Sequence, residues 1–327
     1  MKRRIAGRER GAALLAVLLL VAVTGAIAAA AMEKVRLSRL VAQNVASIGQ
    51  ARAFARGAEQ LAMLTIDDLI ARDPDRTTGD GWMGAVRTIP LPGGGVAEAR
   101  LADGGNCFNL NSVAEGDPRS SLTRRNSGVQ QFAGLMMALE IPEADARRIA
   151  EAAADWVDSD AEPGPNGAED SAYAGGEDPY RAANTLFADP GEARLLAGMT
   201  PQIFARVRPW LCVLPAAELS PLNVNTLTPA QAPLLAMLAP GQIDAQRAAR
   251  VIAARPRQGW ANMIEFWRTE RMSELAVPLD AQLQPQTRTR WFRLQLTVFQ
   301  GEAEFSETAL VDSRLRPSRL ASRAWEN

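Results

Sequence analysis

The residues most able to do chemistry are concentrated between positions 155 and 170, where the sequence reads DWVDSDAEPGPNGAED. When Asp158 is counted as position 1, acidic side chains fall at positions 1, 3, 5 and 12, which is the oxygen-ligand spacing of a calcium-binding loop. The match is incomplete, because position 6 is Pro163 instead of glycine and no clear helix follows. The stretch predicts an oxygen-rich loop that a hard cation would order, and a solvated acidic loop is the alternative.

The amino-acid composition excludes several other chemistries. Histidine is absent from the 327 residues, which excludes Ser-His-Asp and Cys-His catalysis and zinc sites that use histidine. Cys107 and Cys212 are the only cysteines, and in an oxidising compartment we expect them to form a disulfide; two buried free thiols are the alternative. Two acids of the loop could in principle transfer protons, but no nucleophile or positioned base accompanies them. We therefore predict that the protein is not an enzyme.

A second candidate for binding lies between residues 223 and 267, which look like a helix-hairpin-helix. Such hairpins elsewhere hold DNA phosphates on the backbone amides of a G-x-G turn. Here the turn at 239–243 has one glycine and no flanking lysine, and the net charge of the chain is −1. A modest basic face is formed by Arg247, Arg250, Arg255 and Arg257. We interpret the hairpin as a packing element and expect no nucleic-acid partner; a membrane-anchored DNA receptor is the alternative function.

These motifs are carried by a body that follows an apolar amino-terminal segment. Residues 12–31 contain no charge and no proline, and as a helix they would span about 30 Å, the thickness of a bilayer's hydrocarbon core. The basic residues before them predict a cytoplasmic amino terminus and a body on the far side. A cleaved secretory signal is the alternative. The apolar run is longer than a signal core, however, and helical spacing of apolar residues continues beyond Met32.

The remaining patterns predict an α+β fold. One long helix is expected to continue to about Pro74 and to pack on an antiparallel sheet, with strands at 85–91 and 96–101 and later at 291–299 and 304–311. The alanine-rich stretch between them predicts a large inserted all-α domain, and the polar tail at 312–327 is expected to fray. The predicted boundaries are 1–11 for a leader, 12–31 for a membrane segment, 32–75 for the outer half of the helix, 76–119 for the first part of the sheet, 120–275 for the helical domain and 276–327 for the last strands and the tail.

Residues 8–15, RERGAALL, resemble a prepilin leader, which a dedicated peptidase cuts after the glycine before methylating the new amine. Gly11 and Ala12 match the two processing positions. Ala16 stands where most members carry a glutamate, and a buried membrane carboxylate persists only with a partner. The sequence resembles the K-type minor pseudopilins of type II secretion, the general secretion pathway protein K family. The resemblance is carried by this missing glutamate, by the turn and strand at 103–111, and by the DWxDxD and GAED motifs of the acidic loop with a following tyrosine.

The resemblance implies a pilin-like fold whose inserted domain contains a helix-hairpin-helix-like (SAM-like) element and holds calcium. The ligands it implies are Asp158, Asp160, Glu169 and Asp170, with Asp178 as a weaker candidate. The implied function is structural: a single-pass protein of the bacterial inner membrane, with a periplasmic body, that caps the pseudopilus tip and starts its assembly. The implied partners are the I-type and J-type minor pseudopilins and the prepilin peptidase, with secreted substrates and the secretion machinery as a further expectation.

Overall fold

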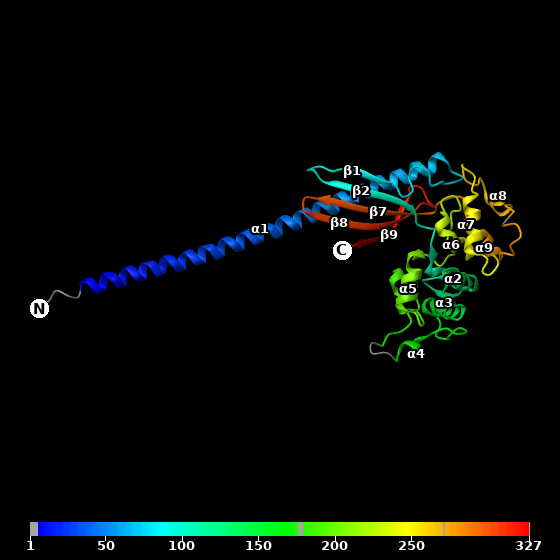
Figure 1. Ribbon diagram of the computed structural model, residues 1–327, viewed down its shortest axis with the longest axis horizontal. Helices are drawn as coiled ribbons and strands as arrows, with labels where there is room; N and C mark the ends of the chain where they lie inside the picture. Colours follow the sequence, from blue (N-terminus) through cyan, green and yellow to red (C-terminus); the bar gives the residue numbers. More distant parts are fainter. Residues whose placement is uncertain (1–5, 176–178, 271, 327) are drawn as a thin grey trace.

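The computed structural model describes residues 6–175, 179–270 and 272–326. Asp178 and the basic residues at positions 2–4 lie outside the described residues. A single helix, α1 (Ala6–Arg72), projects as a rod, and the sheet and the other helices gather around its carboxyl-terminal end (Figure 1).

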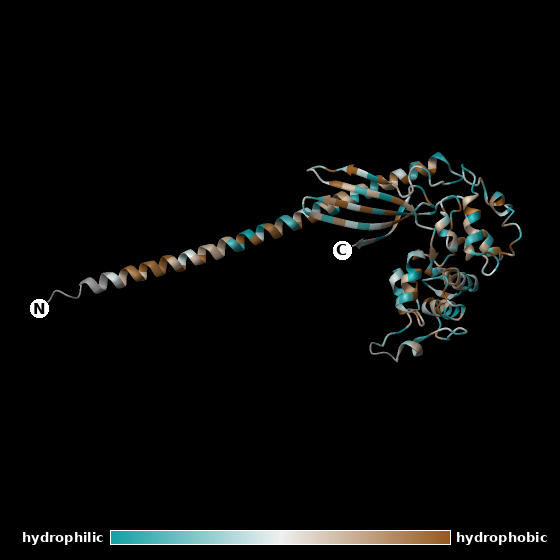
Figure 2. Cartoon of the chain, in the orientation of Figure 1, coloured by the Kyte–Doolittle hydropathy of each residue, from teal (hydrophilic) through white to brown (hydrophobic). Residues whose placement is uncertain are grey.

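Helix α1 changes its environment along its length. Its amino-terminal part forms the apolar band seen in Figure 2, with a mean hydropathy of 2.6 over its most apolar window, none of it buried. This is the one helix, among the described residues, that is long and apolar enough to cross a membrane. Farther along, Ala51, Ala55, Ala58 and Ala62 are buried at helical spacing. Small side chains on one face allow the helix backbone to approach the sheet closely.

The sheet has five antiparallel strands in the order β1 (Val86–Pro90), β2 (Val96–Asp103), β7 (Trp291–Gln300), β8 (Ala303–Asp312) and β9 (Arg319–Glu326). The chain leaves the sheet after β2 and returns as β7, which pairs with β2 from Val96↔Phe299 to Asp103↔Phe292. Alternate residues of β7 form the face that packs against α1, and they are fully or almost fully buried: Phe292, Leu294, Leu296 and Val298. The predicted combination of a long amino-terminal helix and an antiparallel sheet is confirmed.

The prediction that the carboxyl-terminal tail frays was wrong, because β9 extends the sheet to Glu326. Two contacts with α1 hold this segment. The guanidinium of Arg323 donates to the carboxylate of Glu59 at 2.7 Å, and the hydroxyl of Ser318 donates to Asp67 at 2.6 Å. Each pair joins residues more than 250 positions apart. Local sequence patterns therefore could not reveal them.

Between β2 and β7 most of the regular secondary structure in the described chain is helical, and this region lies to one side of the sheet (Figure 1). The helices and short helical turns are η1 (Leu110–Val113), α2 (Asn126–Ala138), α3 (Glu143–Val157), α4 (Asp170–Tyr173), η2 (Pro190–Leu195), α5 (Pro201–Val207), η3 (Arg208–Trp210), η4 (Pro229–Gln231), α6 (Ala232–Ala236), α7 (Ala245–Ala253), α8 (Met263–Trp267) and α9 (Leu279–Leu283). A small hairpin, β4 (Ala114–Asp117) and β5 (Ser121–Arg124), spans the position predicted for the start of the helical domain.

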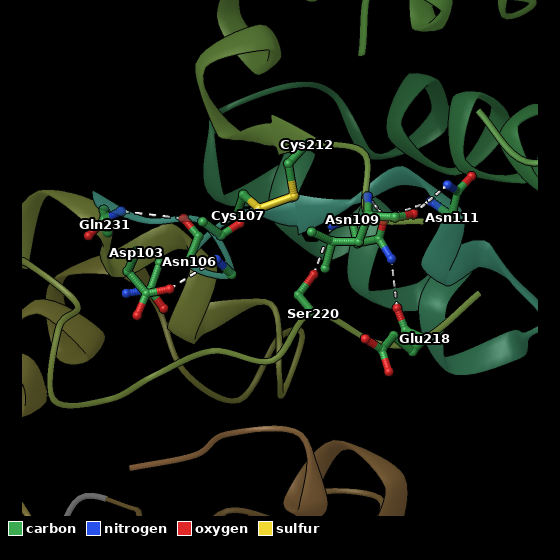
Figure 3. Close-up of a disulfide and its surroundings, with 12 residues drawn as sticks. Asp103, Asn106, Cys107, Asn109, Asn111, Cys212, Glu218, Ser220 and Gln231 are labelled. Carbon is green, nitrogen blue, oxygen red and sulfur yellow. Dashed lines mark hydrogen bonds between the residues drawn. A yellow bond between two sulfur atoms is a disulfide. The ribbon is translucent and has the colours of Figure 1, made fainter. Parts of the chain in front are cut away.

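A disulfide joins Cys107 to Cys212 beside the short parallel pair β3 (Phe108–Asn109) and β6 (Leu211–Cys212), as Figure 3 shows. Next to it, the buried amide of Asn109 donates to the carbonyls of Ala216 and Glu218 and accepts from the backbone N–H of Leu214. These bonds satisfy loop backbone groups that the sheet cannot reach. The side chain of Asn109 therefore orders the backbone of the loop at 214–218.

A second buried polar cluster marks the crossing between the sheet and the helical region. Asp103, at the end of β2, accepts hydrogen bonds from the hydroxyls of Thr226 and Thr289 at 2.7 and 2.5 Å. Burial raises the pKa of Asp103, and these hydrogen bonds oppose the rise. Because Thr289 lies two residues before β7, one carboxylate links both places where the chain passes between the two regions.

Candidate metal centre

Two elements position the acidic side chains. Helix α3 ends at Val157, and Asp158 follows as its carboxyl-terminal cap, donating its N–H to the carbonyl of Ala154 at 2.9 Å. The chain then loops outward and returns so that Glu169 precedes α4. The carboxyl end of a helix carries partial negative charge. Acidic side chains gathered there are repelled by the helix dipole unless a cation compensates them.

The start of the loop is fastened to β5. Ser159 donates its N–H to the carbonyl of Leu122 at 3.0 Å, and its hydroxyl accepts the N–H of Leu122 at 2.9 Å. These reciprocal bonds fix the backbone between Asp158 and Asp160. The two carboxylates are therefore held by a short, anchored segment.

The structure brings three of the predicted ligands together. One carboxylate oxygen from each of Asp158, Asp160 and Glu169 lies within 4.8 Å of the others. Asp158 and Glu169 are only 4% and 5% exposed, whereas Asp160 faces solvent. Asp158 Oδ1 and both Glu169 oxygens have no hydrogen-bond partner in the described part of the chain. Unpaired buried carboxylates are costly, and a bound cation would remove that cost.

Aromatic side chains pack together around the end of α3 and the start of α4. The rings of Trp156 and Tyr173 meet edge-to-face with centroids 5.6 Å apart, and Phe187 stacks on Trp156 at 6.3 Å. All three rings are at most 4% exposed, and burial raises the pKa of Tyr173 to about 12.

The acids consequently hold their protons more tightly than acids in water. Burial, followed by the charges of Asp160, Asp155 and Glu169, raises the pKa of Asp158 to about 7. Burial and the neighbouring Asp155, Asp160 and Asp170 likewise raise the pKa of Glu169 to about 7. A divalent cation among these oxygens would favour the ionised forms and reverse both shifts. The arrangement suits a hard cation, which prefers oxygen ligands.

Asp170, the fourth predicted ligand, is not a member of this group of three. It begins α4, where its carboxylate accepts the N–H of Ala182 at 3.1 Å and lies 3.8 Å from the guanidinium of Arg181. Glu169 is the extended residue that caps the amino terminus of α4, whereas Asp170 is the first helical residue. Only Glu169 joins Asp158 and Asp160, and the sequence spacing gave no sign of which of the two acids would.

One residue of the site was missed as a functional residue. Asp155 entered the sequence analysis only as part of a motif, yet its carboxylate is 1% exposed and accepts the N–H of Gly164. Its spacing of three residues from Asp158 places both on one face at the end of α3. That spacing was the available signal.

The other predicted sites occupy different surroundings. Gly11 and Ala12 are exposed within α1, in continuous helix. In the hairpin region, Arg255 donates to the carbonyls of Val224 and Leu227, and Arg247 lies 3.3 Å from Glu274. Two of the four arginines of the basic face are thus engaged within the chain.

Comparisons with known proteins agree with one another. Two family models described as "Type II secretion system (T2SS), protein K" match residues 106–216 and 222–286. The type II secretion system protein K of Pectobacterium carotovorum subsp. carotovorum is 33% identical over 306 residues, covering 93% of this chain and 92% of that protein. The namesake protein of Klebsiella pneumoniae is 35% identical over 263 residues, covering 79% of each.

A solved structure is also similar over most of its length. It is a chain in the crystal structure of the GspK-GspI-GspJ complex from the enterotoxigenic Escherichia coli type 2 secretion system. The two folds superpose with a TM-score of 0.72 at 26% sequence identity, covering 85% of this chain and 96% of that one.

Proposed function

The chain belongs to the type II secretion system protein K family, and on that premise we propose that it is the minor pseudopilin that caps the tip of the type II secretion pseudopilus and starts its assembly. The observation that supports a cap is the shape of the molecule. The helical region lies beside the sheet at the outer end of α1 (Figure 1). A head of that width would collide with its neighbours inside a filament of closely packed rods.

The placement can be tested by imaging assembled pseudopili that carry a labelled copy of this chain. A cap is expected to give label at one end only. Label repeated along the shaft would contradict the proposal, and filaments that form at a normal rate without the protein would contradict a role in starting assembly.

We also propose that the chain assembles with I-type and J-type minor pseudopilins, by analogy with the complex that contains the similar chain. The stretch of α1 between the membrane segment and the sheet supports this, because Leu37, Leu40, Val41 and Val45 are each more than half exposed. Exposed apolar side chains on a helix favour packing against other helices. Co-purification with both proteins, lost when these leucines and valines become serine, is the expected result.

The proposed topology is a single-pass inner-membrane anchor with a periplasmic body. The unburied apolar part of α1 supports an anchor, and the disulfide suits an oxidising compartment. We propose cleavage by the prepilin peptidase after Gly11 and methylation of Ala12. Mass spectrometry of the mature amino terminus tests this: a methylated Ala12 is expected, whereas a start near residue 31 would indicate ordinary signal cleavage.

We propose that the metal centre binds calcium through Asp158, Asp160 and Glu169. The support is the convergence of their oxygens, together with the unpartnered buried oxygens of Asp158 and Glu169. Calcium takes six to eight oxygen ligands, so backbone carbonyls or water would complete its coordination. A lower melting temperature in a chelator is the expected result, and an unchanged melting curve with and without calcium would remove the site.

The observations favour a structural role over the competing functions. The family is a component of a secretion system, and the basic face of the hairpin is partly engaged in internal contacts. Binding to duplex DNA with a steep dependence on salt concentration would revive the DNA-receptor alternative.

A further inference from the structure

We propose that Asp155 is a positioning residue for the metal centre: its carboxylate holds the loop in the shape that carries Glu169 to Asp158, without binding the ion itself. The inference rests on the metal site proposed above. It assigns a separate task to the one buried acid of the loop that lies outside the group of three carboxylates.

The carboxylate of Asp155 faces the backbone of the returning loop. The N–H of Gly164 approaches its two oxygens at 3.2 and 3.1 Å, and the backbone of Ala168 also hydrogen-bonds to it. The two contacts lie nine and thirteen residues farther along the chain. One side chain at the end of α3 therefore gathers the outgoing and the returning parts of the loop.

A glycine makes this wrapping possible. A Cβ atom built on Gly167 would overlap Asp155 Oδ2, so a side chain at this position cannot coexist with the observed carboxylate. The N–H of Gly167 donates to the carbonyl of Gly164 at 2.9 Å, and Asn166 between them adopts a φ of 66°. Glu169 follows this turn by two residues. The contact between Asp155 and Gly167 therefore sets where the Glu169 carboxylate arrives.

Arg124, whose charge acts on Asp155, forms its hydrogen-bonded ion pair with a different acid. The guanidinium of Arg124 makes a two-pronged pair with Glu151, at 2.9 and 2.7 Å. The hydrogen bonds that reach Asp155 come from loop backbone. If the loop opens, Asp155 loses these donors, and the three ligands lose their common position. Residues that orient metal ligands in this way typically change metal affinity by 10- to 100-fold when altered.

Two substitutions approach the same contact from opposite sides. Asp155→Asn replaces one acceptor oxygen by an N–H₂ group that cannot accept the loop N–H groups. Gly167→Ala places a methyl group against Asp155 and removes no possible ligand. Gly175→Ala is the matched control, since no atom of the described residues lies within 4 Å of a Cβ at that glycine. Gly164→Ala is a milder variant, with its Cβ 3.0 Å from Asp155 Oδ1.

The experiment measures calcium affinity by calorimetric titration of the full chain in detergent, together with melting temperatures in calcium and in chelator. Asp155→Asn and Gly167→Ala should each weaken the Kd by about 10- to 100-fold. The double variant should be little weaker than either one, because both act on one contact. Gly175→Ala should bind like the wild type. A purely structural role for Asp155 would instead lower both melting temperatures equally and leave the Kd unchanged.

The failures are distinguishable. A wild-type chain that takes up no calcium would overturn the metal site and this inference with it. A wild type that binds calcium, combined with a Gly167→Ala variant that binds equally well, would overturn the positioning role and leave the site standing. Loss of binding in Asp155→Asn with normal binding in Gly167→Ala and Gly164→Ala would identify Asp155 as a ligand, which also contradicts the proposal.

Discussion

Buried acids occur in both halves of the molecule, and they are compensated differently. Where α1 meets β8 and β9, Glu59 and Glu307 are 2% and 3% exposed, and Arg323 lies between them at 2.7 and 3.6 Å. In the acidic loop, Asp158 and Glu169 are buried to a similar degree, but no arginine or lysine of the described chain pairs with them. Where α1 meets the sheet, the chain itself supplies the compensating positive charge, on Arg323. In the acidic loop, that charge would have to come from a metal ion in solution.

The largest loss of stability is expected when the Arg323 guanidinium, the positive charge that the protein itself supplies, is removed. Arg323→Gln would leave two buried glutamates without their partner, and breaking a buried pair from one side typically costs about 3–5 kcal/mol. We expect the free energy of unfolding, measured by denaturant titration, to fall by about 3 kcal/mol because Arg323 is partly exposed. Arg316→Gln, at an exposed position, is the control and should change little. If calcium restored the stability of Arg323→Gln, the two clusters would not be independent.

Removal of calcium from the acidic loop should cause the next largest loss of stability. A ligand at 100 times its Kd stabilises the folded state by about 2.7 kcal/mol. Chelation should therefore lower the melting temperature of the wild type clearly, whereas Asp158→Asn should melt at one temperature with and without calcium. A chelator effect of equal size in Asp158→Asn would show that calcium acts elsewhere.

The pH dependence of stability should also differ between the metal-free and the calcium-bound loop. Without metal, Asp158 and Glu169 have folded pKa values of about 7, against ordinary values of 3.8 and 4.5. The folded state then binds more protons than the unfolded state between about pH 4 and pH 7, so stability falls as pH rises through this window. Saturating calcium should flatten or reverse that slope, since it binds the ionised forms. Melting temperatures at pH 5 and pH 8, with and without calcium, measure it; parallel slopes would contradict this account.

The same contrast explains how much could be predicted from sequence. The long helix and the two strand pairs 86–90 with 96–103 and 291–300 with 303–312 follow from local periodicity, and each was anticipated within a few residues. Strand β9 was missed because what holds it is a pairing with β8 and a contact between Arg323 and Glu59, 264 positions away. Its own composition is polar and gives little strand signal.

In the acidic loop, the calcium-loop spacing included Asp158, Asp160 and Glu169, which converge, but also Glu162 at position 5, which lies outside the group of three. Spacing could not show that Asp170 turns toward Ala182, or that Asp155 faces the loop backbone. Both outcomes depend on where the chain folds back after Gly167. Predicting them required the path of the loop in space.

The smallest expected effect concerns the exposed ligand, and it tests whether burial determines how much each of the three carboxylates contributes to calcium affinity. Asp160 faces solvent and also accepts the N–H of Glu162 at 2.9 Å, so water can replace much of what its carboxylate gives a cation. Asp160→Asn should therefore weaken the calcium Kd less than Glu169→Gln, whose oxygens are buried and unpartnered among the described residues. Asp170→Asn is the matched control and should leave the Kd unchanged. Calorimetric titrations that ranked Asp160→Asn as the most damaging variant would show that the exposed carboxylate, and not the buried pair, dominates binding.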